Sequence, residues 1–578
     1  MSGKKSEYAE EESEEYEKKV TFLFLSPEEH VLIRPDTYVG SIEKQKKEVW
    51  ILNETKTEMI EETIEYVPGL FKIFDEILVN AADNKQRDEE MKKIEVTINE
   101  KEKYIEIIND GKGLPIGIHK EYNCQIIELI FGHLLTSSNY NDKKKKTVGG
   151  RNGFGAKLTN IFSKRFEIET IDKIKKKRYE QIWKNNMKEK EEAKITDCKN
   201  KNSYTRVRFY PDFEKFGMIG FEKGIIKLIE KRVYDIAGTT WSKLKVYLNG
   251  LLININSFEE YVKLYLGINK KKNKEYFIYK EKDNNRWEII IGLSIEQEYK
   301  QISHVNNIWT MKGGNHVKYI IEQIIDYIRN NYKTKIKSIG NINDIKNILK
   351  PQFIKDQIFI FINCLIENPS FSSQTKEEMI LKKTNFGSEC NLPENFLKKI
   401  LISIRDNLDD RIQFKIKQDS KKTDGKKNNN KKLRLDPDII DANDAGPGSN
   451  CVLILVEGKS AKSYALGGVS VLPGGRNKYG IFPLRGKLLN VRDENKLKIS
   501  KNKEISNLKQ LLGLREDVNY NDLNIFETLR YEKIMIMTDQ DYDGSHIKGL
   551  IINYFHNGWP ELIIKNGFLT QFITPIVM

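Results

Sequence analysis

Two groups of short motifs, about 300 residues apart in a chain of 578, constrain the fold more than any other feature. The N-terminal group combines a polar helix face with glycine-rich turns in FDEILVNAADN (74–84), NDGKG (109–113) and GGRNGFGAK (149–157). In the C-terminal group, VEGKSAK (456–462) and TDQDYDG (538–544) place carboxylates where two strands are expected to end. The first group suits ATP hydrolysis, and the second suits metal-dependent chemistry on a nucleic-acid phosphate. Because one core is too small for a chain of this length, we expect about three or four domains.

The charge of the chain favours a polyanionic partner. Net charge is +14, and lysines cluster at 143–146, 175–178, 270–272 and 421–432. A general abundance of lysine and asparagine explains the charge equally well, so charge alone leaves nucleic-acid binding open. No apolar run approaches the roughly 18 residues of a membrane helix, and the acidic N-terminus lacks the apolar core of a secretory signal. Five scattered cysteines fit neither a zinc site nor a disulfide framework, which indicates a reducing compartment.

Hydrophobic periodicity predicts the elements that would carry these motifs. Residues 71–84 read as an amphipathic helix, and residues 94–98 and 104–108 alternate as strands do. Alternation around Asn249 and Gly250 predicts a hairpin, taken as the start of a second domain. Helices are expected over 317–332 and 395–408, and the apolar run VLILV (452–456) is expected to open a third domain.

The predicted helix brings Glu76, Asn80 and Asp83 to one face, since they lie at positions i, i+4 and i+7. A carboxylate there suits a general base that takes a proton from the water attacking a γ-phosphate. The Asn80 carbonyl is a hard oxygen of the kind that Mg²⁺ accepts. A solvated polar face is the competing interpretation of this pattern.

Two glycine-containing turns complete the predicted nucleotide site. The Asn109 amide suits an adenine edge, because Gly111 and Gly113 allow close approach of the backbone. The loop after Gly149 offers backbone N–H groups for phosphates, and Lys157 adds charge. Each turn alone is unspecific, but their order and spacing together indicate an ATP site. The site is neither a Walker loop nor a dinucleotide fingerprint, because both patterns are absent.

These residues resemble the ATPase fold shared by gyrase, the heat-shock-90 chaperones, the mismatch-repair MutL proteins and histidine kinases. Within that superfamily, EILVNAADN, LLTSSNY (134–140), GGRNGFGAK and NPSFSSQTKE (368–377) are similar to eukaryotic type IIA topoisomerases. The resemblance implies that Glu76 is the general base, Asn80 a Mg²⁺ ligand and Asn109 the adenine-binding residue. The implied nucleotide-binding residues further include Ser137, Ser138, Asn139, Gly150, Arg151, Asn152, Gly153, Phe154, Gly155, Ala156, Lys157, Gln374, Thr375 and Lys376. Of these, Gln374 and Lys376 would reach the γ-phosphate from a second domain, with Lys376 also catalytic.

The C-terminal carboxylates form a separate predicted site. Glu457 follows one expected strand and Asp539 another, and parallel strand ends open onto one edge of a sheet. Asp539, Asp541 and Asp543 alternate, so in an extended segment their side chains would point the same way. Glu457, Asp539 and Asp541 would then surround Mg²⁺, which prefers oxygen ligands. A calcium loop is the alternative, but Leu550 stands where an EF-hand needs glutamate.

Glutamate followed by DxD resembles the TOPRIM metal domain, and PLRGKLLNVR (483–492) narrows the likeness to type IIA topoisomerases. Lys459 stands where that family usually has an acidic residue; it lies beside the proposed ligands and adds positive charge there. The chain stops where relatives continue into a winged-helix domain with the DNA-cleaving tyrosine. We therefore expect this portion to hydrolyse ATP without cleaving DNA.

The resemblance implies an α+β multidomain fold: a GHKL (Bergerat) ATPase α/β sandwich, a transducer domain of ribosomal-protein-S5-like α/β fold, and a TOPRIM Rossmann-like α/β domain. We expect an acidic flexible tail over 1–19, the ATPase domain over 20–238, the transducer over 239–410, a basic flexible linker over 411–448 and TOPRIM over 449–578.

The implied function is that of a nuclear, homodimeric enzyme with ATP and Mg²⁺ as cofactors and double-stranded DNA as partner. Family members close a gate on ATP binding and pass one duplex through a transient break in another. The rivals are a GHKL ATPase of the chaperone or mismatch-repair class and a degenerate binding protein without catalysis. The TOPRIM-like carboxylates disfavour the first rival, and the intact Glu76, Asn80, Asp539 and Asp541 disfavour the second.

Overall fold

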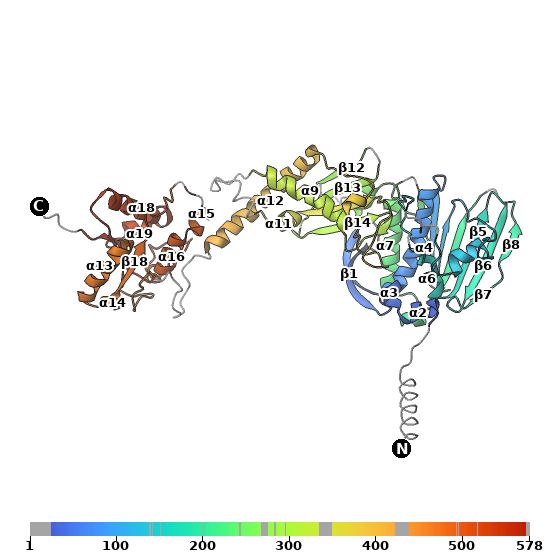
Figure 1. Ribbon diagram of the computed structural model, residues 1–578, viewed down its shortest axis with the longest axis horizontal. Coiled ribbons are helices and arrows are strands. Elements are labelled where there is room, and N and C mark those ends of the chain that lie inside the picture. Colours follow the sequence, from blue (N-terminus) through green and yellow to red (C-terminus); the bar gives the residue numbers. More distant parts are fainter. Residues whose placement is uncertain are drawn as a thin grey trace, which may run out of the picture. The chain divides into compact units, whose positions relative to one another are not determined.

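The computed structural model describes residues 25–137, 140, 143–150, 152–199, 202–241, 244–267, 275–282, 285–294, 296–333, 349–421, 438–492, 494, 496–516 and 518–573. The chain divides into two compact units (Figure 1). Met1–Asp326 and Lys355–Ile400 form the first, and Tyr327–Ile354 and Leu401–Met578 form the second. The predicted acidic tail lies outside the described residues. No helix within the described ranges is long and apolar enough to span a membrane.

A nine-stranded sheet and its covering helices make the first part of the first unit. The strand order is β11-β10-β3-β4-β9-β5-β6-β7, with β8 paired to β6. The strands are β3 (Lys93–Asn99), β4 (Tyr104–Asn109), β5 (Ser163–Asp172), β6 (Lys177–Lys184), β7 (Glu189–Lys190), β8 (Lys194–Asp197), β9 (Thr205–Pro211), β10 (Lys245–Leu248) and β11 (Leu251–Leu252). The accompanying elements are α2 (Pro27–Ile33), α3 (Pro35–Tyr38), α4 (Pro68–Arg87), α5 (Ile126–Gly132), α6 (Gly155–Ile161), η1 (Phe213–Phe216), α7 (Lys223–Thr239) and the hairpin of β1 (Gln45–Leu52) and β2 (Met59–Tyr66).

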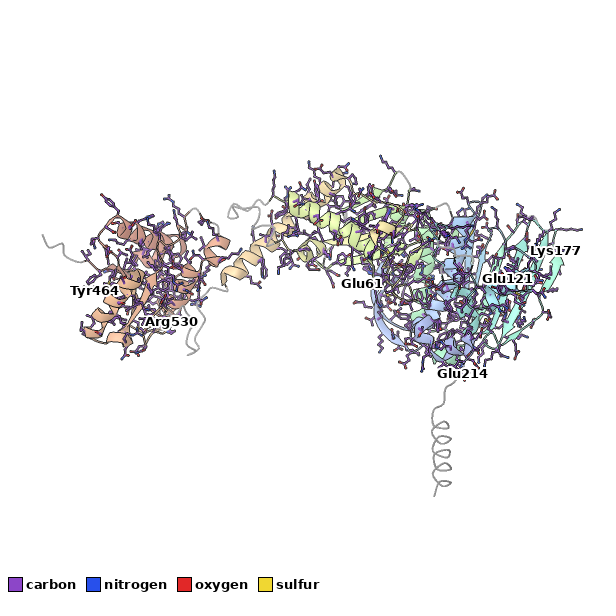
Figure 2. The ribbon with its side chains drawn as sticks, in the orientation of Figure 1. Glu61, Glu121, Lys177, Glu214, Tyr464 and Arg530 are labelled. Carbon is purple, nitrogen blue, oxygen red and sulfur yellow. The ribbon has the colours of Figure 1, made fainter. Side chains whose placement is uncertain are left out.

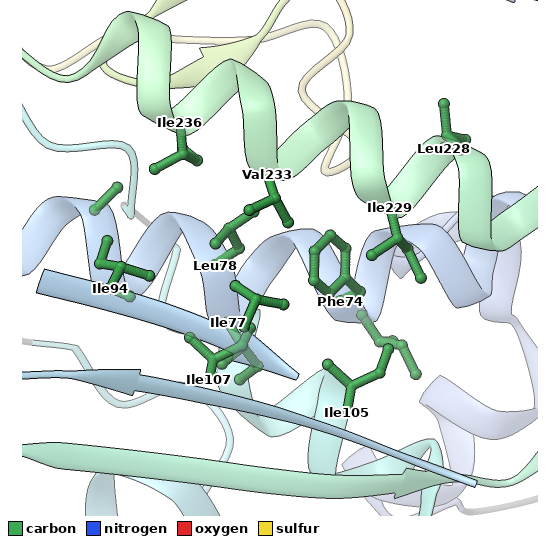
Figure 3. Close-up of a cluster of buried hydrophobic side chains, with 14 of the residues drawn as sticks. Phe74, Ile77, Leu78, Ile94, Ile105, Ile107, Leu228, Ile229, Val233 and Ile236 are labelled. Atoms are coloured by element: carbon green, nitrogen blue, oxygen red, sulfur yellow. The ribbon is translucent and has the colours of Figure 1, made fainter. Parts of the chain in front are cut away.

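Helix α4 lies at the centre of this layer because it is apolar on more than one side. Proline at its first turn suits the helix start, and Lys85 and Arg87 suit the negative end of its dipole. Phe74 and Leu78 face α7, while Ile77 packs toward Ile94 and Ile107 of the sheet (Figure 3). Each fully buried side chain of this kind contributes about 1.5–3 kcal/mol. The packing fixes the rotation of α4 and so aims its polar residues.

A second, five-stranded sheet belongs to the same unit, with strand order β12-β13-β16-β14-β15. Its strands are β12 (Tyr276–Lys280), β13 (Trp287–Leu293), β14 (Lys300–Val305), β15 (Ile308–Trp309) and β16 (Ile358–Cys364). Among the helical elements of residues 258–421, α8 (Phe258–Leu266) and η2 (Lys383–Asn385) belong to this unit, α9 (Asn315–Asn331) and α12 (Glu394–Lys421) cross its boundary, and α11 (Pro351–Lys355) lies almost wholly in the second unit. Every residue of β16 is buried, which is typical of a central strand covered on both faces.

The second unit contains a four-stranded parallel sheet of order β18-β17-β19-β20. Its strands are β17 (Val452–Glu457), β18 (Tyr479–Leu484), β19 (Lys533–Met537) and β20 (Leu569–Gln571). The helices are α13 (Gly458–Val471), α14 (Gly475–Lys478), α15 (Lys496–Lys501), α16 (Lys503–Leu512), α17 (Leu523–Phe526), α18 (Tyr542–Gly558) and α19 (Pro560–Ile564). Leu453 and Leu455 enter one hydrophobic cluster, and Ile454 and Val456 enter another, so both faces of β17 are covered. On the outer side of α13, Tyr464 projects into solvent (Figure 2).

The structure corrects two expected boundaries. The hairpin at Asn249 and Gly250 forms, but β10 pairs in parallel with β3, so it completes the first sheet and does not open a second domain. The predicted linker is also too long. Helix α12 continues to Lys421 and buries Ile412, while Ile440 pairs with Ile481 of β18. Both ends of the predicted linker are rich in charged residues, so the few apolar residues that pack there were not recognised in the sequence. Residues 422–437 lie outside the described ranges.

Candidate nucleotide-binding site

A cavity of about 660 Å³ opens between α4, α5, α6, β4 and β9, a volume suited to a nucleotide. Its walls include both glycine-containing turns and two residues, Gln374 and Lys376, from the loop after β16. The predicted residues that line it are Glu76, Asn80, Asn109, Ser137, Gly150, Asn152, Gly153, Phe154, Gly155, Ala156, Lys157, Gln374 and Lys376. Segments from four regions of the sequence therefore meet in one place.

Three predicted residues, Ser138, Asn139 and Arg151, lie outside the described part of the chain. Thr375 is described but does not line the cavity, and its hydroxyl pairs with Ser373 within its own loop at 2.6 Å. Its neighbours Gln374 and Lys376 turn into the cavity instead, with Lys376 in the left-handed backbone conformation (φ 61°).

Glu76 is buried at the wall of the cavity between two lysines. Lys376 Nζ lies 3.1 Å and 3.3 Å from its two carboxylate oxygens, and Lys72 Nζ lies 2.7 Å from Oε1. Burial raises the pKa of the Glu76 carboxyl, but Lys376 and Lys72 together outweigh it and bring the pKa to about 2. The carboxylate is therefore ionised at neutral pH, as a general base must be, and is held weakly basic while both lysines contact it.

Asp83 fixes the glycine loop. Its two oxygens accept hydrogen bonds from the backbone N–H groups of Gly149 and Gly150 at 2.8 Å and 2.9 Å. Asn80, one turn earlier, is exposed in the cavity and makes no side-chain hydrogen bond to another described residue, so its carbonyl can face a ligand. Burial raises the pKa of Asp83, opposed by the two N–H donors.

The far side of the loop approaches the helix closely. A Cβ atom on Gly155 would lie 2.3 Å from Glu76 Oε2, so a larger residue there would displace the Glu76 carboxylate, and Gly153 has a left-handed backbone (φ 70°). Lys157 is buried and donates to the carbonyls of Thr136 and Gly153 at 2.6 Å and 2.8 Å. Burial lowers the pKa of its ammonium to about 8, which leaves it mostly charged at pH 7.

The remaining contacts join loops across the cavity. Asn84 Nδ2 donates to Asn109 Oδ1 at 2.8 Å, which fixes the Asn109 amide at the cavity wall. Asn152 Nδ2 donates to Gln374 Oε1 at 2.9 Å, so the glycine loop is tied to the loop after β16.

Sequence reasoning missed Lys72 and the anchoring role of Asp83. Lys72 precedes Glu76 by one helical turn, and the i, i+4 spacing of lysine and glutamate was the signal that could have revealed it. No spacing rule could reveal that Asp83 binds the loop 66 residues later.

The predicted carboxylate site lies on the second unit. Val456 of β17 is paired with Met537 of β19, so Glu457, the last residue of β17, and Asp539, two residues after β19, lie at the same ends of neighbouring parallel strands. Glu457 Oε2 is buried without a hydrogen-bond partner. Burial, and then the charges of Asp539, Asp541 and Asp543, raise the pKa of Glu457. An unpaired oxygen among like charges fits a cation ligand.

The extended arrangement predicted for Asp539, Asp541 and Asp543 is wrong. Helix α18 begins at Tyr542, and Asp541 caps it by accepting from the Gly544 N–H at 2.7 Å. Asp543 lies in the first turn and pairs with Lys487 at 3.0 Å. Within the described ranges, no three carboxylate, histidine or cysteine residues are grouped closely enough to hold a metal ion as they stand.

Comparisons with known proteins agree with this arrangement. The model of the histidine kinase-, DNA gyrase B- and HSP90-like ATPases matches residues 66–215, that of DNA gyrase B matches 257–432, and that of the Toprim domain matches 452–573. They bear out the expected combination of ATPase, transducer and Toprim folds.

Named relatives are similar over nearly the whole chain. DNA topoisomerase 2 of Arabidopsis thaliana is 49% identical over 95% of this chain and 36% of its own length. The probable DNA topoisomerase 2 of Dictyostelium discoideum is 47% identical over 95% of this chain and 35% of its own length. The crystal structure of the ATPase region of Saccharomyces cerevisiae topoisomerase II aligns with a TM-score of 0.61 at 47% identity, covering 68% of this chain and 98% of that one. This chain thus spans little more than a third of the length of these curated relatives.

Proposed function

The chain belongs to the DNA topoisomerase II family, and we propose from this premise that it supplies the ATP-driven gate and part of the metal site of such an enzyme. ATPase, transducer and Toprim domains follow in that order. The single observation that carries the proposal is the contact of Lys376, from the loop after β16, with Glu76 in the wall of the nucleotide cavity. This contact supports a role for Lys376 beside the γ-phosphate of a bound ATP.

In the proposed reaction, Glu76 takes a proton from the water that attacks the γ-phosphate. Lys376 moves from the Glu76 carboxylate to the more highly charged phosphate, which frees the carboxylate to accept that proton. Contacts that ATP makes and ADP lacks are the kind that shift a conformational equilibrium. Nucleotide state would thereby control the loop after β16 and the sheet that carries it.

The rest of the cavity would hold the nucleotide. Backbone N–H groups of the glycine loop and the Lys157 ammonium suit the phosphates, and the Asn109 amide suits the adenine edge. Ser137 lines the cavity, and the family resemblance assigns it to the ribose and phosphate region of the nucleotide.

Metal binding is proposed at two places. Asn80 presents an exposed amide oxygen in the nucleotide cavity and would hold Mg²⁺ together with the phosphates of ATP. Glu457, Asp539 and Asp541 would hold Mg²⁺ at the sheet edge, where the unpaired Glu457 oxygen fits a cation. A bound Mg²⁺ stabilises charge on a phosphate oxygen.

Double-stranded DNA, a homodimer that closes on ATP, and a nuclear location complete the proposal. The net charge of +14 supports a polyanionic partner. The second candidate, an ATPase of the chaperone or mismatch-repair class, is disfavoured by the Toprim match at 452–573.

The discriminating experiment measures steady-state ATP turnover with and without duplex DNA. We expect stimulation by DNA that fades as salt rises, since phosphate contacts depend on counterion release. Glu76→Gln should bind a non-hydrolysable ATP analogue normally yet lose turnover by about 10²–10⁴-fold. Turnover unaffected by DNA would favour the second candidate, and wild-type turnover in Glu76→Gln would remove Glu76 from the reaction.

A further inference from the structure

Behind Glu76, on the side away from the cavity, lies a buried chain of charged side chains that the proposed reaction does not use. Lys72 Nζ is shared between Glu76 Oε1 at 2.7 Å and Asp75 Oδ2 at 3.8 Å. Arg232 Nε, on α7, donates to Asp75 Oδ1 at 2.7 Å. Lys72 and Asp75 are 5% and 6% exposed and Arg232 is fully buried, so water screens these charges little.

We propose that Arg232 is a positioning residue for ATP hydrolysis, acting on Glu76 through Asp75 and Lys72. The proposal rests on the proposed function, in which Glu76 is the general base. The carboxylates of Asp75 and Glu76 compete for the Lys72 ammonium, and the Arg232 guanidinium already pairs with Asp75. Because Arg232 neutralises Asp75, Lys72 stays with Glu76, and the carboxylate keeps both its orientation and its charge.

This support matters most when nucleotide is bound. Of the two lysines that contact Glu76 in the described structure, Lys376 would leave for the γ-phosphate. Lys72 then remains as the cation beside Glu76. How closely Lys72 contacts Glu76 rather than Asp75 then determines the pKa of the Glu76 carboxyl. Removing Arg232 would let Asp75 draw Lys72 away, and burial would then raise the pKa of Glu76.

Arg232 also contacts the second sheet. Its Nη2 donates to the carbonyl of Asn307 at 2.6 Å, in the turn between β14 and β15. The preceding residue, Asn306, donates from Nδ2 to the carbonyls of Val148 at 3.2 Å and Ile366 at 2.9 Å. Val148 directly precedes the glycine loop. One tight turn of the second sheet thus contacts the support of Glu76 and the start of the phosphate-binding loop, so a shift of that sheet would be felt at the base.

Other charged groups surround Arg232 but have their own partners. Asp235 lies 3.7 Å from Arg232 Nη1 and is also 2.8 Å from Lys231 and 3.6 Å from His304. Lys231 additionally lies over the ring of Trp309 at 3.4 Å. Asp235 therefore keeps a cation when Arg232 is removed, whereas Asp75 loses its closest one.

The test compares Arg232→Met with the double variant Arg232→Met/Asp75→Asn, both in the complete chain. Arg232→Met is expected to lower kcat by about 10–100-fold through misplacement of the base, with binding of a non-hydrolysable ATP analogue unchanged. The acid limb of its kcat–pH profile should move to higher pH. The double variant removes the competing carboxylate, so it should recover most of kcat and return the acid limb toward that of the wild type.

Arg208→Met is the control, because Arg208 of β9 also pairs with a carboxylate, that of Glu106 on β4 at 2.7 Å, but lies outside the cavity lining. It should keep the wild-type kcat and pH profile. Thermal unfolding must show that each variant is folded; if Arg232→Met is not, Lys72→Met takes its place and must show the same lower kcat and shifted limb.

The outcomes separate this proposal from the one it rests on. Wild-type turnover in Glu76→Gln would overturn the general base and the proposed function with it. Loss of turnover in Glu76→Gln, together with wild-type kcat and pH profile in folded Arg232→Met, would overturn the positioning role alone. A double variant as slow and as shifted as Arg232→Met would show that the charge of Asp75 is not the link.

Discussion

The nucleotide site and the carboxylate site solve the problem of a buried negative charge in opposite ways. Glu76 is enclosed by the lysines Lys72 and Lys376, and its pKa falls to about 2. Glu457 has a buried oxygen without a partner and acidic neighbours, and its pKa rises. The first site supplies two lysines to its carboxylate, whereas at the second Lys487 pairs with Asp543 and the Glu457 oxygen stays unpaired; we propose that a cation from solution would fill that place.

That difference fits the two proposed chemistries. In the proposed reaction Lys376 exchanges its Glu76 partner for the γ-phosphate, which would make the position of this lysine depend on whether ATP is bound. In the proposed chemistry the unpaired oxygen of Glu457 would help to bind a metal ion, and that ion would stabilise charge on a phosphate. Under the proposed function, the nucleotide site would rearrange its internal ion pairs when ATP binds, and the carboxylate site would take up a metal ion.

The largest expected contrast is in stability. Glu76→Gln should lower the free energy of unfolding by about 3 kcal/mol, because it leaves Lys376 buried without its carboxylate partner and leaves Lys72 with only the Asp75 carboxylate at 3.8 Å. Glu457→Gln should leave stability equal or slightly higher in EDTA, because it removes a like charge. Denaturant unfolding of both variants measures the contrast, and a stabilised Glu76→Gln would break it.

Lys376→Ala tests the internal cation directly. Loss of a cation from the γ-phosphate is expected to slow turnover by about 10–100-fold, the usual range for one charge-stabilising contact. The variant should also fail to dimerise on a non-hydrolysable ATP analogue, measured by sedimentation. Thr375→Ala is the matched control, since Thr375 lies in the same loop without lining the cavity. Normal turnover and dimerisation in Lys376→Ala would remove this loop from the nucleotide response.

The sequence predicted most of the nucleotide site because its residues sit within short motifs on regular elements. The helix at 71–84 was found as α4, and thirteen of the predicted residues line one cavity. Contacts between residues far apart in the sequence were harder to predict. Only the family resemblance indicated that Lys376 lies near Glu76, 300 residues away. Asp75–Arg232 was not visible either, because no local pattern reports which buried charges meet across helices.

The carboxylate site was predicted less well for a physical reason. Strand ends were placed correctly by apolar runs, but aspartate is also a preferred helix N-cap. Asp541 takes that role, which turned an expected extended segment into the start of α18. The alternation of acidic residues in the sequence therefore did not predict which way the side chains of Asp539, Asp541 and Asp543 point.

In the absence of nucleotide, Mg²⁺ should stabilise the carboxylate site but not the nucleotide site. Occupancy of the Glu457 site at 100 times its Kd would add about 2.7 kcal/mol to the stability of the second unit. Differential scanning calorimetry with and without Mg²⁺ measures this, and Asp541→Asn should remove the gain without affecting ATP turnover. Equal stabilisation of wild type and Asp541→Asn would place the metal elsewhere.

The smallest expected effect is the pH dependence of stability in Glu76→Gln and Glu457→Gln, measured in EDTA. The Glu76 pKa is lowered from 4.5 to about 2, so its stabilising contribution is complete above pH 4.5 and is lost as pH falls toward 2. The deficit of Glu76→Gln should accordingly shrink in that window. The Glu457 pKa is raised above 4.5, so ionised Glu457 opposes folding at neutral pH and ceases to do so as acid protonates it. Glu457→Gln should be more stable than the wild type at neutral pH, and this difference should also vanish in acid. Its sign is thus opposite to that of Glu76→Gln, which is less stable than the wild type at neutral pH. Two differences of the same sign would mean that the carboxylate at β17 has a cationic partner in solution, and the contrast between the sites would fail.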